Sequence, residues 1–283
     1  MKKLILPLLI GLYAHAFAGE LGFAPIFNEG AVLQCEMPVN IWGTADPGET
    51  VTVSFGEQTK TAEAHADRKW MLQLDPMKAS SKPRPLVGQF QASGSRFQVS
   101  KVHVGEVWLA TGQSNMYQPA RVTQEGREAL KRVHPKIHFS KVPLRTGGPH
   151  IPPCTKEELA WGEFGPKHNL LAAVAFHFAE ELQPKVEKHV GVIQCSYGGT
   201  PLESWMPEDL LLSLPSGNRS KVIIERERKR GFGVDEWKKE MAECDAAETP
   251  NLKRPRGNPF DSKAPAALDK SMTTDIIPYT PRG

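Results

Sequence analysis

The sequence predicts an α/β fold, a partial parallel sheet flanked by helices, preceded by a small N-terminal β-sandwich-like domain. Over residues 21–105, apolar and polar residues alternate, and this period indicates strands with one buried face. From about residue 106 the pattern changes to strand, helix, strand, which is typical of a parallel sheet. We therefore expect a β domain at 19–105 and an α/β domain at 106–283.

The expected strands of the β domain are short and separated by turns. The clearest are "VTVSF" at 51–55, "KWMLQL" at 69–74 and "RFQVSKVHV" at 96–104. Pro47 and Gly48 are placed for a tight turn ahead of the first of these. Several short strands at this spacing indicate a small sandwich.

The α/β domain is expected to hold three parallel strands, at 106–111, 136–142 and 189–195. A helix is expected over 169–182, because apolar residues recur four apart and so share one helix face. These residues are Leu170, Val174, Phe178 and Leu182.

Charge gives little sign of a nucleic-acid partner. The 283 residues carry a formal net charge of +3. Residues 209–270 are polar and charged, and we expect them to form an insertion of solvated helices and loops. Within it, the basic run at 226–230 is interleaved with Glu225 and Glu227, which favours an exposed helix face over a nucleic-acid patch.

The first 18 residues have the order of a secretory signal peptide. Lys2 and Lys3 precede an apolar run, which closes on Ala16-Phe17-Ala18. The run is short for a bilayer span, so we expect a secreted or periplasmic protein without stable membrane insertion; a membrane anchor is the alternative.

An oxidising compartment would permit disulfides. Four cysteines allow three complete pairings, and the sequence does not choose among them, nor between a disulfide and free buried thiols. The cysteines are Cys35, Cys154, Cys195 and Cys244. Because no C-x-x-C spacing occurs, a zinc site is not expected from them.

The segment "GEVWLATGQSNM" suggests a nucleophile. An apolar strand ends at Gly112, and Gln113, Ser114 and Asn115 follow at its tip. A tight turn from strand to helix exposes a serine hydroxyl and directs backbone N–H groups toward a developing oxyanion. Met116 stands where a G-x-S-x-G elbow would have glycine, and an ordinary polar turn is the alternative.

A second glycine-rich segment, "CSYGGTPLESW", follows the strand expected at 189–195. Gly198 and Gly199 would let the backbone approach another group closely, such as the oxyanion of an acyl-transfer site. Taken alone, the pair equally fits an ordinary turn.

Together, "VGEVWLATGQSNM" and "VGVIQCSYGGTPLESWMP" resemble the sialate O-acetylesterase family of SGNH-type (GDSL-like) hydrolases. The resemblance covers most of 23–208, including "PIFNEGAVLQCEMPVNIWGTADPGETVTVSF". It implies that Ser114 is the nucleophile and one oxyanion donor, and that Gly198 or Gly199 gives a second. Gly112, Gln113 and Asn115 would support the turn, and Glu203 and Trp205 would pack or contact substrate.

The resemblance also implies two later blocks that this sequence does not contain. One has the form W-Y-Q-G-E-S-N and brings an Asn oxyanion donor; the other brings an Asp/His pair. His134 superficially resembles the second block, but Lys131 stands where its Asp would be. We therefore expect a C-terminally truncated copy, with a missing half encoded downstream as a candidate partner.

The implied reaction is removal of acetyl groups from O-acetylated carbohydrates, with no metal or organic cofactor. Without its base, the chain alone is expected to have little activity. The alternatives are a non-catalytic secreted carbohydrate-binding or interaction protein, and one half of a split esterase.

Overall fold

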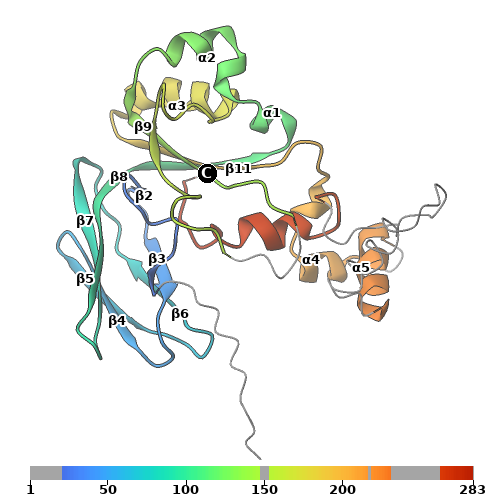
Figure 1. Ribbon diagram of the computed structural model, residues 1–283, viewed down its shortest axis with the longest axis horizontal. Helices are drawn as coiled ribbons and strands as arrows, with labels where there is room; N and C mark the ends of the chain where they lie inside the picture. Colours follow the sequence, from blue (N-terminus) through green and yellow to red (C-terminus); the bar gives the residue numbers. More distant parts are fainter. Residues whose placement is uncertain (1–20, 147–152, 216–217, 231–261, 283) are drawn as a thin grey trace, which may run out of the picture.

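The structure is a computed structural model that describes residues 21–146, 153–215, 218–230 and 262–282 (Figure 1). The expected signal peptide at 1–18, Cys244 and much of the expected charged insertion lie outside the described residues.

The N-terminal region consists of two sheets, as the alternating pattern predicts. A three-stranded antiparallel sheet has the order β1-β3-β6, and the second sheet contributes β7, β4 and β5. Their inward residues are buried in strict alternation, for example in β4 and β6. The bounds are β1 Gly22–Phe23, β3 Val39–Thr44, β4 Thr50–Phe55, β5 Gln58–Glu63, β6 Lys69–Leu74 and β7 Ser80–Phe90. The strands expected at 51–55, 69–74 and 96–104 are confirmed.

A single long strand, β8 (Arg96–Gly112), joins this region to the α/β part. Its first half pairs antiparallel with β7, and its second half pairs parallel with β11 (Val190–Ser196). Short β2 (Val32–Gln34) also pairs with it around residue 104. The expected boundary at 105/106 therefore lies inside one continuous strand, whose two halves pair with different strands.

The parallel sheet has the order β10-β9-β11-β8, with β10 (Gly162–Phe164) antiparallel at its edge. The three expected parallel strands are confirmed as β9 (His134–Lys141), β11 and the second half of β8. Every residue of β11 is buried, as expected of a central parallel strand. Ser196 lies beside Gly112 in the register, so β8 and β11 end together.

Helices cover one face of the parallel sheet (Figure 1). They are α1 Ser114–Tyr117, η1 Ala120–Val122, α2 Gln124–Ala129 and α3 Ala173–Val186. The expected helix is confirmed as α3, but the apolar face named from the spacing is not the buried one. Leu170, Val174 and Phe178 are 47%, 53% and 43% exposed. The face on the sheet instead contains Phe176 among small alanines, which let the helix approach the strands closely.

The C-terminal segment covers the opposite face (Figure 1). Residues 262–282, including η4 (Asp269–Thr273), bury Leu268, Met272 and Ile276 in the same core as Ile193 and Cys195. Three further helices precede this segment in the chain: η3 Leu202–Ser204, α4 Glu208–Ser213 and α5 Arg219–Arg230. Figure 1 shows α4 and α5 at the edge of the molecule. Among the described residues, no helix combines the length and apolar character needed to cross a bilayer.

Candidate active site

Ser114 occupies the turn that links β8 to α1. Gly112 has φ +140°, a backbone conformation that side chains disfavour, and it directs the chain away from the sheet. Gln113, Ser114 and Asn115 follow, and all three are exposed. Ser114 is the first residue of α1, so the backbone N–H groups of that turn have no helical partner.

The glycine-rich segment after β11 lies directly beside this turn. The Tyr197 N–H donates to the Gly112 carbonyl at 3.0 Å. A Cβ atom added to Gly198 would lie 3.8 Å from the Ser114 Cα, so the two residues are neighbours. Gly199 has φ +76° and no atom within 4 Å of its Cβ position. Gly198 is therefore a direct neighbour of Ser114, and the Cβ position of Gly199 faces open space.

Gln194 and Ser196, which the sequence analysis did not identify, hold the Ser114 turn in place through hydrogen bonds. The buried Gln194 donates from Nε2 to the Met116 carbonyl (3.2 Å) and contacts Ser196 Oγ (3.1 Å), while its Oε1 accepts from the Ala172 N–H (2.8 Å). Ser196 Oγ also donates to the Met116 carbonyl, at 2.9 Å. The sequence did carry a signal for Gln194: a glutamine inside the hydrophobic run "VGVIQCS" is buried and therefore requires hydrogen-bond partners.

Replacing Gln194 with leucine is expected to destabilise the fold by about 2–3 kcal/mol, because the buried Ala172 N–H loses its acceptor and the α1 turn loses a donor. Urea unfolding followed by circular dichroism would measure this. The exposed Gln124→Leu serves as the matched control, and equal stability of the two variants would contradict the assigned support.

Within the described part of the chain, no histidine contacts Ser114. His134 lies at the amino end of β9, whereas Ser114 follows the carboxyl end of β8. The Nε2 atom of His134 contacts the Ala129 carbonyl at 3.1 Å. His177 lies on α3 and contacts Glu180 at 3.4 Å. A triad partner for Ser114 is therefore not among the described residues.

Trp205, at the end of the second glycine-rich segment, packs within its own loop and against the main core. Trp205 Nε1 donates to Thr200 Oγ1 at 3.0 Å, and Thr200 donates to the Tyr197 carbonyl at 2.8 Å. Trp205 is partly buried against the main core, while Glu203 is exposed. These contacts fix the shape of the loop that carries Gly198.

Known proteins are similar to this chain in sequence and in fold. The chain is 32% identical over 238 residues to the sialate O-acetylesterases of Homo sapiens and Pongo abelii, an alignment covering 71% of this chain and 42% of each relative. The chain belongs to the sialate O-acetylesterase family. The Mus musculus sialate O-acetylesterase is 28% identical over 245 residues, covering 80% of this chain and 43% of the relative. This member of the family thus spans less than half the length of the curated relatives it matches.

A solved structure supports the fold of this family member. A carbohydrate acetylesterase from Xanthomonas citri superposes with a TM-score of 0.69 at 24% identity, covering 93% of this chain and 50% of that one. No protein-family model matches the chain.

The three cysteines that the structure describes in this chain are free thiols. Cys35, Cys154 and Cys195 are all buried and unpaired. Burial, with a smaller contribution from Asp275, raises the pKa of the Cys195 thiol to about 12. A thiol held protonated is a poor nucleophile, so none of the chemistry is assigned to Cys195.

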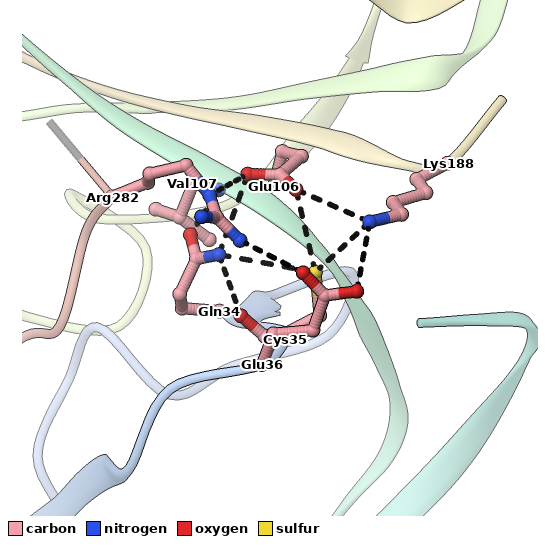
Figure 2. Close-up of polar contacts among 7 residues, drawn as sticks. All are labelled: Gln34, Cys35, Glu36, Glu106, Val107, Lys188 and Arg282. Atoms are coloured by element: carbon pink, nitrogen blue, oxygen red, sulfur yellow. Dashed lines mark hydrogen bonds and ion pairs between the residues drawn. The ribbon is translucent and has the colours of Figure 1, made fainter. Parts of the chain in front are cut away.

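A buried charge network lies at the other end of the parallel half of β8. Figure 2 shows Glu106 between Lys188 and Arg282, with Gln34, Cys35 and Glu36 around it. Because Glu106 and Gly112 stand at opposite ends of the same strand segment, this network anchors the strand and is separate from the Ser114 turn.

Proposed function

We propose that this chain carries the nucleophile of a carbohydrate O-acetylesterase, acting on acetyl groups of O-acetylated sugars such as sialic acids. The observation that carries the proposal is the exposed Ser114 at a strand-to-helix turn, with the Gly198 backbone beside it. Family membership supports the same chemistry, since the curated relatives are named sialate O-acetylesterases.

The reaction is acyl transfer. A base removes the Ser114 proton, Oγ attacks the acetyl carbonyl, and the sugar hydroxyl leaves with a proton, which gives an acetyl-enzyme. Water then attacks the acetyl carbonyl, releasing acetate and restoring Ser114. The backbone N–H groups of Ser114 and of Gly198 or Gly199 are the proposed oxyanion donors, because the segment that carries these glycines lies beside Ser114.

The base of this reaction is not found among the described residues. Since no described histidine contacts Ser114, the described residues supply a nucleophile and backbone donors without a proton acceptor. Loss of the triad histidine reduces turnover by up to about 10⁶-fold in a serine hydrolase. We therefore propose that the chain alone is a weak esterase, and that it acts in a secreted or periplasmic setting given its first 18 residues.

Chemical rescue tests this proposal. Acetate release from an O-acetylated sugar would be measured with the full chain, with and without added imidazole as an external base. We expect imidazole to raise the rate about tenfold or more, up to the roughly 10²–10⁴-fold that a positioned general base supplies. Ser114→Ala should abolish the increase, whereas Ser93→Ala, at an exposed serine of the β region, should leave it intact.

The lack of a described base also favours a second candidate, a non-catalytic carbohydrate-binding protein. Binding of the acetylated sugar, with no imidazole-dependent release and no effect of Ser114→Ala, would favour this candidate. Activity that appears only when a second polypeptide is added, and that depends on Ser114, would identify half of a split esterase.

A further inference from the structure

Three histidines from three neighbouring strands meet at a point distant from the catalytic end of the sheet. His103 lies on β8, His138 lies on β9, and His189 immediately precedes β11. The ring centroid of His103 is 4.5 Å from that of His138 and 4.2 Å from that of His189. His138 and His189 are only 2% and 8% exposed. These residues, called the histidine cluster below, take no part in the proposed reaction.

Their nitrogens converge. His138 Nε2 lies 3.0 Å from His189 Nδ1, and one nitrogen from each of the three rings lies within 4.8 Å of the others. Zn–N bonds of about 2.0–2.1 Å at tetrahedral angles place ligand nitrogens roughly 3.3 Å apart. Small side-chain shifts therefore suffice to bring three nitrogens onto one ion.

The hydrogen bonds of the histidine cluster do not satisfy all of its ring nitrogens. His103 Nδ1 is buried and has no partner among the described residues. A neutral imidazole has a single N–H, and backbone carbonyls of Pro135 and Ser81 already favour protons on His138 and His189. If those protons point to the carbonyls, the two nitrogens that face each other at 3.0 Å both present lone pairs. A cation between them would remove that conflict, and carbonyl-bound outer N–H groups are typical of metal-ligating histidines.

We propose that His103, His138 and His189 bind one divalent transition metal ion of the Zn²⁺ class through three imidazole nitrogens. The ion would join β8, β9 and β11 across the sheet.

The surrounding charges are mixed. Lys101 and Lys136 oppose a cation, while Glu163 favours one. The site therefore depends on nitrogen ligation, which favours Zn²⁺, Cu²⁺ or Ni²⁺ over Mg²⁺ and Ca²⁺.

The test uses the full chain, without an affinity tag and stripped of metal with a chelator. Zn²⁺ would be titrated by calorimetry, and Co²⁺ would report the ligands through its visible absorption. We expect one ion per chain and a Zn²⁺-dependent rise in the unfolding temperature, with no rise for Mg²⁺. His103→Gln should weaken Zn²⁺ binding by more than the roughly 10–100-fold typical of losing an outer-shell partner.

His177→Gln, on the exposed part of α3, is the matched control and should bind as the unmodified chain does. Unchanged Zn²⁺ affinity in a folded His103→Gln variant would overturn the proposal. If that variant does not fold, the Zn²⁺ titration and the Co²⁺ spectrum of the unmodified chain decide. A Co²⁺ spectrum of octahedral, oxygen-ligated form, or no saturable binding, would equally overturn it.

Discussion

Replacing Glu106 with alanine is expected to lower the free energy of unfolding by about 3 kcal/mol, because breaking a buried ion pair leaves its partners uncompensated. The Glu106 side chain is 6% exposed, and it pairs with Lys188 Nζ at 3.3 Å and with Arg282 Nε (Figure 2). Gln34 Nε2 adds a hydrogen bond at 3.4 Å. We place the effect at the lower end of the range for buried pairs because Lys188 and Arg282 are 25% and 36% exposed.

The same network predicts a dependence on pH. Burial acts to raise the pKa of Glu106, but the hydrogen bonds from Arg282 and Gln34 outweigh it, and the net shift is downward from 4.5. A carboxyl with a lowered folded-state pKa stabilises the fold above its unfolded pKa, and this stability is lost as the pH falls through the folded-state value. Urea unfolding at neutral pH and below pH 4 should therefore show a smaller acid-induced loss in Glu106→Gln than in the unmodified chain.

Glu57→Ala is the matched control for both measurements, since Glu57 is exposed in the β4–β5 turn. Substitution at such a surface site should change stability by no more than about 0.5 kcal/mol. A Glu106→Ala variant as stable as this control would show that the network does not hold β8 to the C-terminal segment.

Replacing Tyr279 with alanine is expected to cost about 3–5 kcal/mol, as for other large aromatic residues in a core. Tyr279 is 5% exposed and stacks on Phe27 with ring centroids 5.5 Å apart. Its hydroxyl donates to the Val32 carbonyl at 2.7 Å. The ring therefore fastens residues 262–282 to the N-terminal strands, and its loss should release that segment.

Tyr279→Phe separates packing from hydrogen bonding. It keeps the ring and removes only the donor, so we expect a loss of about 1–2 kcal/mol. Hydrogen exchange measured along the chain would locate the effect. Loss of protection confined to 262–282 and β2 would agree with the fastening role, whereas equal stability of the alanine and phenylalanine variants would contradict it.

Local pattern was sufficient for the strands. The alternation in "KWMLQL" and the largely apolar run at 190–195 each indicate how many faces of a strand are buried, and β6 and β11 agree with them. The buried face of α3 did not follow from spacing, because the helix packs its alanines closely on the sheet and leaves Val174 and Phe178 53% and 43% exposed. Large apolar residues at helical spacing identify a helix but not the face on which its neighbours lie.

The candidate site was predicted in part. Ser114 and Gly198 follow two parallel strands that end side by side, so their proximity follows from topology once the strands are known. Gln194 could not be assigned in advance, because its partners, Ala172 and Met116, are distant in sequence. The histidine cluster was missed for the same reason, since its members are separated by 35 and 51 residues (103 to 138, and 138 to 189).

The central claim, that Ser114 is an acyl acceptor beside the Gly198 backbone, is tested most directly by locating the covalent intermediate. The full chain would be incubated with an activated acetyl ester in the presence of imidazole, quenched in acid and analysed by peptide mass spectrometry. Acetylation of Ser114 that exceeds that of every other serine, and that is lost in Ser114→Ala without redistribution, is the predicted result. Acetyl groups spread over exposed serines and lysines, with Ser114 no more modified than Ser93, would contradict the account.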